Sequence, residues 1–208
     1  MRLIVVAAVA LMFAATIGCR KNSTSPSQQQ GSAGLIPLKI GNKWYYQSTS
    51  YNENGSVNTA GTDSISCETS FVLNGTTYYG WIVGSDSGFL GNVDQNTVYQ
   101  ASGNQAGLFF KRVSTDGALI TSVPLPFYNG CTGKQDLTGF IHTTPKLGYD
   151  CISNEVDSYD CSNKLVDKTI IYLKPGLGWV STEIYELKMD GSGLYLAGTL
   201  NLTSYHLN

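Results

Sequence analysis

The chain has 208 residues and a formal net charge of −2, and charged residues make up only 13% of it. Proteins that bind nucleic acid through its phosphates present a basic face, so this composition argues against a nucleic-acid partner. The 23 glycines and 13 tyrosines, set among few charges, are common in exported β proteins.

The first 18 residues predict a secretory signal. Arg2 precedes an uncharged apolar run over residues 3–17, which is too short for a spanning helix with its own anchors. The sequence Thr16-Ile17-Gly18-Cys19 resembles a bacterial lipobox, with Thr16 where leucine is usual. We therefore expect cleavage before Cys19 and lipidation of its thiol with acyl chains such as palmitate, which together hold a protein on a membrane. The alternative is an ordinary signal peptide with a cysteine there by chance.

Residues 19–34 predict a lipidated cysteine followed by a flexible tether, because the segment after Cys19 is polar and rich in Gly, Ser and Gln. Residues 35–208 then predict a single all-β domain, which is long enough to bury a core. Arg20 follows the cysteine where aspartate would retain a lipoprotein at the inner membrane, and no acidic run follows it. By analogy with these sorting rules, we expect anchorage in the cell outer membrane with the domain facing the periplasm.

Short β-rich runs joined by Gly, Asn and Asp turns predict an all-β, mostly antiparallel meander. In chain order we expect strands at residues 44–49, 62–73, 76–83, 97–100, 107–114, 149–157 and 168–173. Asn74-Gly75 is the clearest turn, because a type I′ hairpin needs positive φ at both residues. Residues 85–96 are predicted to be rich in turns. Pro124 and Pro126 indicate an extended edge or loop.

Residues 169–208 predict a long terminal hairpin around which the other strands are arranged. Its first arm contains Trp179 and Val180, and the arm ends at Asp190-Gly191. In the second arm leucines recur at alternate positions and predict one half-buried face: Leu194, Leu196, Leu200 and Leu202. A hairpin cannot bury such a face alone, so strands from earlier in the chain must cover it.

Four cysteines remain after Cys19: Cys67, Cys131, Cys151 and Cys161. An even number in an oxidising compartment predicts two disulfides, with three connectivities open. Ten residues of straight strand would span about 33 Å, so a Cys151–Cys161 bond requires a turn between them. Residues 156–160 offer such a turn, and we expect this pair, with Cys67–Cys131 following by elimination. The sequence lacks C-x-x-C spacing, which argues against a zinc site.

Two segments carry a family resemblance. The opening PLKIGNKWYY, residues 37–46, and the closing YLKPGLGWVSTEIYEL, residues 172–187, resemble motifs of small, uncharacterised Gram-negative envelope lipoproteins. These proteins share a Pro-Leu-Lys-x-Gly-Asn-x-Trp-x-Tyr pattern after the tether and Pro-Gly-x-Gly-x-Val before the last hairpin. The resemblance implies an extracytoplasmic curved sheet, or a half-barrel like that of the lipoprotein carriers LolA and LolB. It implies no established activity.

Candidate residues for chemistry are few. An acidic cluster could supply oxygen ligands to Ca²⁺, but it lacks the EF-hand spacing and is better explained as a solvated strand edge: Asp150, Glu155, Asp157 and Asp160. The only histidines are His142 and His206, and no carboxylates are paired for acid–base work. We therefore expect no catalytic residues, no metal and no cofactor, and predict that the protein is not an enzyme.

The aromatic side chains are the remaining candidates. Neighbouring aromatics on a strand point to opposite faces, so some rings could line a ligand groove for a lipid or glycan: Trp44, Tyr46, Tyr79, Trp81 and Trp179. The favoured alternative is that both faces are covered or that outward rings are isolated on the surface. Our first functional expectation is a non-catalytic binding or carrier module for an apolar or envelope ligand. The alternative is a structural or interaction lipoprotein that docks an envelope protein through a sheet edge.

Overall fold

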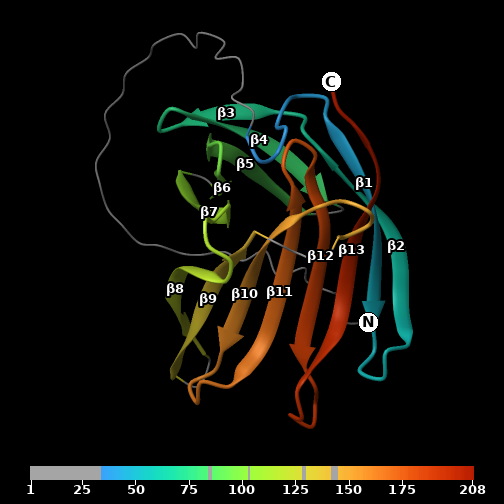
Figure 1. Ribbon diagram of the computed structural model, residues 1–208, viewed down its shortest axis with the longest axis vertical. Coiled ribbons are helices and arrows are strands. Elements are labelled where there is room, and N and C mark those ends of the chain that lie inside the picture. Colours follow the sequence, from blue (N-terminus) through green and yellow to red (C-terminus); the bar gives the residue numbers. More distant parts are fainter. Residues whose placement is uncertain (1–33, 84–85, 103, 128–129, 142–144) are drawn as a thin grey trace.

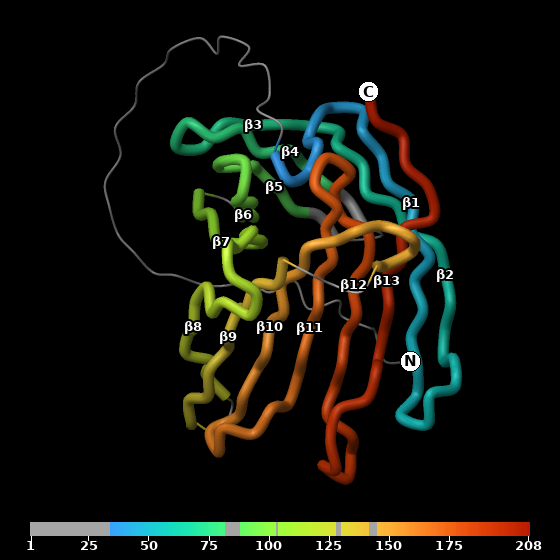
Figure 2. The backbone as a smooth tube through the Cα atoms, in the orientation of Figure 1, coloured from blue at the N-terminus to red at the C-terminus, as the bar shows by residue number. Residues whose placement is uncertain are grey.

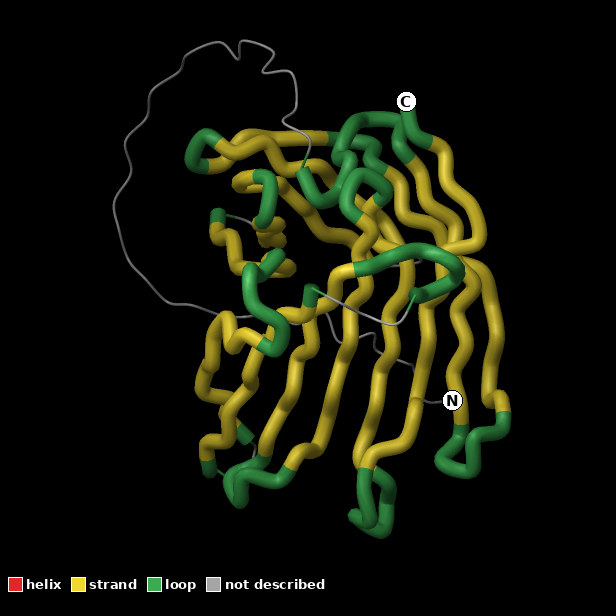
Figure 3. Tube along the Cα trace, viewed as in Figure 1, coloured by secondary structure: helices red, strands yellow, loops and turns green. Residues whose placement is uncertain are grey.

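The computed structural model describes residues 34–83, 86–102, 104–127, 130–141 and 145–208. The predicted signal peptide, Cys19, the tether up to residue 33 and His142 lie outside the described residues. Within those residues the secondary structure consists of antiparallel strands and the turns between them, as predicted (Figure 3). Among them no helix occurs that could span a membrane.

The larger of two sheets has eight antiparallel strands in the order β2-β1-β13-β12-β11-β10-β9-β8 (Figure 1). Its strands are β1 (Lys43–Tyr51), β2 (Val57–Ser66), β8 (Ala118–Pro126), β9 (Thr132–Phe140), β10 (Ile152–Tyr159), β11 (Leu165–Lys174), β12 (Gly178–Leu187) and β13 (Leu194–His206). The last strand of the chain pairs with the first, so the two ends of the domain meet inside this sheet. The sheet is open, with β2 and β8 as its edges.

The smaller sheet is a five-stranded meander behind the upper part of the larger one (Figure 1). Its strands are β3 (Ser70–Leu73), β4 (Thr76–Val83), β5 (Asp86–Asp94), β6 (Thr97–Ser102) and β7 (Gln105–Lys111). The β3–β4 hairpin turns at Asn74-Gly75 with φ of 50° and 81°, which confirms the predicted I′-like turn. The upper ends of β1 and β13 bend toward this sheet (Figure 2). A β-bulge at Tyr45–Tyr46 in that pair accounts for such a bend.

The predicted strand over residues 62–73 is wrong, because the chain changes sheets within it. Its first part belongs to β2 of the larger sheet and its last part is β3 of the smaller one. Between them, Cys67 donates its N–H to the Asn42 carbonyl at 2.9 Å and accepts from the Gly41 N–H at 2.8 Å. These bonds hold the crossover residue beside the start of β1 while the chain turns away.

The turn-rich prediction for residues 85–96 is also wrong, because residues 86–94 form β5. Two glycines in this strand are required by packing. A Cβ on Gly88 would lie 2.7 Å from Trp81 Nε1, and one on Gly91 would lie 2.9 Å from the Thr77 carbonyl oxygen. Glycine therefore lets the neighbouring strand and its tryptophan approach closely.

The terminal hairpin is confirmed as the pair β12–β13, but its leucines do not share one face. A bulge lies opposite Ile184 and Tyr185, where the partner changes from Gly198 to Leu196. An inserted residue reverses which face the following side chains occupy. Leu200 and Leu202 therefore lie on the face opposite to that of Leu194 and Leu196.

One hydrophobic core joins the two sheets. The larger sheet contributes Trp44, Tyr46, Ile152, Ile171, Leu173, Val180 and Leu202, and the smaller sheet contributes Trp81, Leu90, Val98 and Phe110. We call the core-facing side of the larger sheet its inner face and the opposite side its outer face. The fully buried Asn154 on the inner face accepts from the Lys111 N–H at 2.8 Å and donates to the Lys111 carbonyl at 3.0 Å. This amide ties β10 to β7 and satisfies both polar groups away from water.

Candidate functional site

The two segments that carry the family resemblance meet in space. We call residues 35–46 and 175–180 together the motif junction. The Trp44 indole donates to the Leu177 carbonyl at 2.7 Å, and the Tyr46 hydroxyl donates to the Trp179 carbonyl at 2.9 Å. Both aromatic side chains are buried, at 2% and 1% exposure. The motif aromatics therefore satisfy backbone carbonyls of the Pro-Gly turn inside the core.

Asn42 fixes the opening motif to the end of the chain. Its side-chain amide donates to the Pro37 carbonyl at 2.5 Å, and its Oδ1 accepts from the Asn208 N–H at 2.8 Å. Gly178 has a φ of 103°, and a Cβ there would lie 3.2 Å from Ile36. The resemblance motifs are thus explained by packing and hydrogen bonding at the junction.

The five aromatics predicted to line a ligand groove fill the core instead. Trp44, Tyr46 and Trp81 are buried, and the half-buried Tyr79 packs against the same cluster. The Trp179 ring makes edge contacts with Tyr46 and Phe109, at centroid distances of 6.4 and 5.7 Å. The groove hypothesis is wrong for these residues, because the two sheets pack against each other through one core, to which Trp44, Tyr46 and Trp179 contribute from the larger sheet and Tyr79 and Trp81 from the smaller one. The alternative of covered faces describes them correctly.

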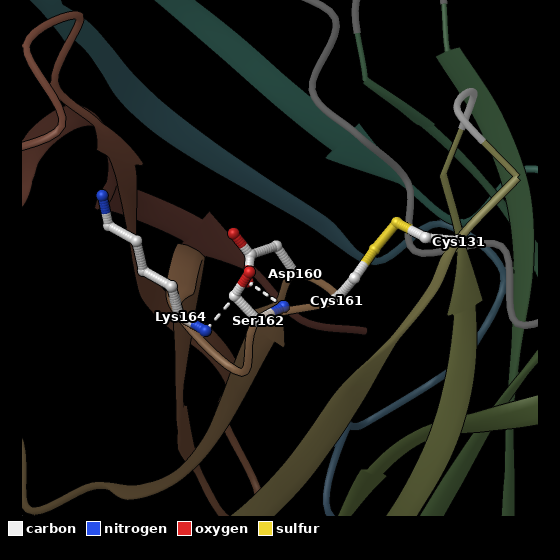
Figure 4. Close-up of a disulfide and its surroundings, with 5 residues drawn as sticks. All are labelled: Cys131, Asp160, Cys161, Ser162 and Lys164. Carbon is white, nitrogen blue, oxygen red and sulfur yellow. Dashed lines mark hydrogen bonds between the residues drawn. A yellow bond between two sulfur atoms is a disulfide. The ribbon is translucent and has the colours of Figure 1, made fainter.

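The disulfide joins Cys131 to Cys161, with their Cα atoms 6.0 Å apart (Figure 4). Our expected pairs, Cys151–Cys161 and Cys67–Cys131, are therefore wrong. Strands β9 and β10 are antiparallel neighbours, so the residue before β9 lies beside the end of β10. Cys151 precedes the opposite end of β10. Cys67 and Cys151 are buried thiols, and burial raises the pKa of Cys67 to about 11.

Asp160 closes the turn beside this disulfide. Its Oδ1 accepts hydrogen bonds from the Ser162 N–H at 2.8 Å and the Lys164 N–H at 2.9 Å (Figure 4). An aspartate that accepts from backbone N–H groups two and four residues ahead stabilises a turn. This carboxylate therefore already has a structural function, and the predicted acidic cluster loses one of its four members.

Charged and tyrosine side chains line the outer face of the larger sheet. Cross-strand pairing places them on one face of β9 to β12, and we call this set the charged strip: Lys134, Asp136, Glu155, Asp157, Tyr159, Lys168, Tyr172, Glu183 and Tyr185. Residues 145–151 cross over the strip as a strap (Figure 1). The strip was not predicted from the sequence as a unit. Alternate polar positions in each strand signalled it, but only the strand register shows that these positions share a face.

Lysines neutralise the carboxylates of the charged strip. Lys168 Nζ lies 2.5 Å from Glu155 Oε1 and 3.5 Å from Asp157 Oδ1, and Lys146 of the strap pairs with Glu183. Within the described ranges, no three His, Cys, Asp or Glu side chains converge closely enough to hold a metal ion. Two members of the candidate Ca²⁺ cluster thus have a lysine where a cation would lie.

Lysines also cover two tyrosine rings of the strip. Lys134 Nζ lies 4.6 Å from the centroid of Tyr159, and Lys146 Nζ lies 4.8 Å from that of Tyr172. The hydroxyls of Tyr172 and Tyr185 donate to Glu183 at 3.0 and 3.1 Å. A ring face occupied by an ammonium group is not free to stack against a sugar. The strip is therefore a network of mostly internal contacts, in which Asp157 Oδ1 is buried without a hydrogen-bond partner and lies 3.5 Å from Lys168 Nζ.

The pKa changes in the strip all follow from burial and from contacts with neighbouring side chains. Burial raises the pKa of Asp157, and burial together with the Glu183 carboxylate raises the pKa of Tyr172 and Tyr185. Burial acts to raise the pKa of Asp136, but hydrogen bonds from Lys134 and Ser122 hold it below its ordinary value. None of these changes activates a nucleophile beside a base, which nucleophilic catalysis requires.

Asp167 is the acidic group with the largest change, and it lies on the inner face of β11. Burial and the directly opposed Glu186 carboxylate raise its pKa to about 6. Two opposed carboxyl groups repel each other when both are ionised, so the folded chain disfavours the charged form of Asp167. We therefore regard Asp167 as a determinant of stability.

Two hollows are the best defined in the described part of the chain, and both are open to solvent. One of about 460 Å³ lies between β7 and β8 and is lined by residues that include Lys111, Arg112 and Leu119. The other, of about 420 Å³, lies over β1, β2 and β13 beside Tyr45 and Asp63. Both mix charged, polar and apolar side chains, whereas a lipid carrier needs a mostly apolar, enclosed cavity.

Comparison with known proteins adds little to this geometry. No protein-family model matches the chain, and no curated protein matches its sequence significantly. Among solved structures, it is similar to a Bacteroides fragilis protein, inferred to be exported and said to have a YmcC-like fold, with a TM-score of 0.47 and 10% identity over 84% of this chain and 100% of that one. It is also similar to an inferred lipoprotein of Parabacteroides distasonis, with a TM-score of 0.48 and 11% identity over 85% and 100%. Neither likeness is close enough to assign a role.

Proposed function

We propose that the protein is a lipid-anchored, extracytoplasmic and non-catalytic interaction module. The anchor rests on the apolar run that ends at Gly18-Cys19 and on the polar segment that follows. Arg20 supports outer-membrane sorting, with the domain facing the periplasm. The resemblance to uncharacterised envelope lipoproteins supports the same location. Its two motifs form one packed junction in this structure, as expected if the resemblance reflects a common fold.

One observation supports the interaction role over the carrier role. The aromatic side chains that would line a carrier's cavity are buried between the two sheets. Their hydrogen-bonding groups at Trp44 and Tyr46 already bind backbone carbonyls. A carrier needs an apolar volume that is empty until the ligand arrives. The filled core favours a module that acts through its surface, so the interaction role becomes the leading proposal.

The absence of a catalytic role is part of the proposal. In the described residues, the densest group of ionisable side chains is the charged strip, and its carboxylates and tyrosines are bound to one another and to lysines. A reaction would need a group with an altered pKa beside a free site for substrate. The strip offers ion pairs but no such vacancy.

Two measurements test the proposal. Replacement of Cys19 by serine removes the acylated thiol, so the full-length variant should move from the membrane fraction to the soluble fraction after cell lysis. Unchanged fractionation of Cys19→Ser would contradict lipid anchorage. Cys67→Ser is the control, because this buried thiol lies in the folded domain and its loss should leave fractionation unchanged.

The second measurement is native mass spectrometry of residues 20–208 exported to a periplasm. A filled core predicts the mass of the polypeptide alone. A stoichiometric lipid or glycan adduct that survives purification would contradict the surface-acting module and restore the carrier hypothesis.

A further inference from the structure

The hollow between β7 and β8 differs in charge from the hollow over β1, β2 and β13. Among the described residues, its lining contains the cations Lys111 and Arg112 and no carboxylate. The lining of the second hollow contains Asp63 and no cation. Two positive charges without a negative one attract an anion. We call the first hollow the cationic hollow, and its lining consists of Asn96, residues 111–114 and residues 118–120.

Backbone hydrogen bonds fix the position of both cations. The N–H and the carbonyl of Lys111 bind the buried Asn154 amide at 2.8 and 3.0 Å, and the Arg112 N–H donates to the Asn96 carbonyl at 2.8 Å. Both cationic side chains are exposed. In the described ranges neither forms an ion pair, whereas lysines of the charged strip do. The two charges are therefore held at defined points and are accessible to a ligand.

Two carboxylates lie close to the cationic hollow in sequence, but they do not line it. Asp94 accepts a hydrogen bond from the Asn96 N–H at 2.7 Å, and Asp116 accepts one from the Ile141 N–H at 2.8 Å. Each carboxylate thus binds the backbone of a turn or of a neighbouring segment. Within the part of the chain that the structure describes, neither carboxylate forms an ion pair with the two cations.

Apolar side chains complete the cationic hollow. Three half-buried residues form part of its lining: Val113, Ala118 and Ile120. Leu119 of β8 also lines it and is 62% exposed. A ligand that fits this surface has an anionic group beside hydrocarbon. Phospholipids at a membrane surface have that combination, because Lys and Arg bind phosphate oxygens while an apolar side chain enters the boundary with the acyl chains.

The cationic hollow lies near the start of the domain, where the predicted tether ends. Ile36 binds the Asn92 side chain of β5 through its N–H, at 3.4 Å, and through its carbonyl, at 2.7 Å. The turn that follows β5 contains Asn96 of the hollow. The tether predicted over residues 19–33 would span about 20 Å on average as a flexible chain. A membrane that holds the acyl chains is therefore within reach of this side of the domain.

We propose that the cationic hollow binds anionic headgroups of the membrane that carries the lipid anchor. The inference rests on the proposed function, because the anchor keeps this side of the domain near that membrane and raises the effective concentration of headgroups. Lys111 and Arg112 bind the headgroup phosphates, and Leu119 enters the boundary between headgroups and acyl chains. The anchor confines the domain and the hollow orients it, so that the domain presents one fixed side to its partners.

The test uses the mature, lipidated protein in vesicles of phosphatidylcholine, alone or mixed with phosphatidylglycerol. An environment-sensitive fluorophore on Leu119→Cys reports contact with the bilayer. Its emission should shift to the blue in the phosphatidylglycerol vesicles, and high salt should reverse the shift by screening the attraction. The matched control is Val57→Cys, because Val57 is 59% exposed on the opposite edge of the larger sheet. No shift at residue 119, or equal shifts at both positions, would overturn the proposal.

A charge variant separates recognition of the headgroup from simple proximity to the membrane. In the Leu119→Cys background, Lys111→Gln with Arg112→Gln removes both charges and leaves the backbone hydrogen bonds in place. The blue shift should fall several-fold while circular dichroism stays unchanged. Lys39→Gln with Lys43→Gln removes two other exposed charges and should change the shift little. A shift that persists in the first double variant, or that falls equally in both, contradicts headgroup binding by the cationic hollow.

Inorganic phosphate and vesicle flotation distinguish the remaining outcomes. Millimolar phosphate, added to the labelled Leu119→Cys protein in neutral detergent without vesicles, should give no blue shift. A shift equal to that in vesicles would mean that the hollow binds the free anion, and it would overturn membrane docking. Protein that floats with the vesicles but shows no shift contradicts the docking alone. Wild-type protein that carries no lipid and does not float contradicts the anchor, and the docking inference fails with it.

Discussion

The motif junction and the charged strip are both rich in hydrogen bonds, but they differ in access to water. At the junction, Trp44 and Tyr46 donate to carbonyls inside the core. In the strip, lysines such as Lys168, 25% exposed, pair with carboxylates on the outer face. A buried donor that is removed leaves its acceptor without water, whereas an exposed ion pair exchanges one set of partners for solvent. Polar contacts therefore stabilise this fold mainly where water cannot replace them.

Trp44→Ala should give the largest effect at the motif junction. It opens a cavity and leaves the Leu177 carbonyl without its donor, so we expect a loss of about 3–5 kcal/mol in the free energy of unfolding. Urea unfolding followed by tryptophan fluorescence measures it. Tyr45→Ala is the control, since the neighbouring ring is 43% exposed and its loss should cost much less. Equal losses for the two variants would contradict the distinction between buried and exposed contacts.

The disulfide at the end of the charged strip should rank next. Replacement of both Cys131 and Cys161 by serine removes a crosslink between residues 30 apart in sequence, with an expected loss of about 2–4 kcal/mol. Reducing agent should lower the urea midpoint of the wild type and leave that of the double variant unchanged. If reduction does not affect the wild type, the disulfide does not constrain the strip.

Tyr46→Phe removes a single oxygen atom from the junction. The Trp179 carbonyl loses its donor while the ring and its packing remain, so we expect a loss of about 1–2 kcal/mol. Tyr205→Phe removes a hydroxyl from a ring that is 47% exposed and should change stability little. Thermal or urea unfolding of the pair gives the difference directly, and no difference would show that the buried hydroxyl is replaceable.

Asp167→Asn tests the carboxyl on the strip's opposite side. The pKa of Asp167 is raised from 3.8 to about 6 in the folded state, so the folded chain is penalised for its charge above that pH. The amide variant should be more stable than the wild type by about 1 kcal/mol at pH 7–8, after allowance for partial exposure. The gain should vanish as the pH falls through 6 toward 4. A gain that is constant with pH would exclude this titration as its cause.

Lys168→Gln should give the smallest effect. It breaks the pairs with Glu155 and Asp157, yet these pairs are partly solvated, and we expect a loss of less than about 1 kcal/mol. The loss should shrink as salt screens the interaction. Urea midpoints measured at low and high ionic strength provide the comparison. A large, salt-independent loss would mean that the strip behaves like the junction.

Local turn chemistry allowed much of the fold to be predicted from the sequence. Asn74-Gly75 and Asp190-Gly191 lie at the hairpin turns expected of them, and Pro124 and Pro126 do lie in an edge strand. These signals depend only on the conformations that a few neighbouring residues can adopt. The all-β class follows from them.

The errors lie where distant strands decide the outcome. Residues 85–96 are predicted to be rich in turns, but Gly88 and Gly91 lie within a strand whose neighbours pack closely against them. The disulfide depended on the β9–β10 register, which sequence spacing cannot supply. The charged strip was missed because only the strand register shows which polar positions share a face. The aromatic residues were misplaced because the sequence does not show that a second sheet covers the inner face of the first.

The position of Leu35 determines how the domain would bear a mechanical load. The Leu35 carbonyl accepts from the Gly176 N–H at 3.3 Å, and the Ile36 carbonyl accepts from the Asn92 amide at 2.7 Å, so the first residues of the domain are bound by both sheets. A force applied to the preceding chain is therefore transmitted to the buried motif junction, where these hydrogen bonds would have to break at the same time. A pull on the free edge of β2 would instead unzip one hydrogen bond at a time.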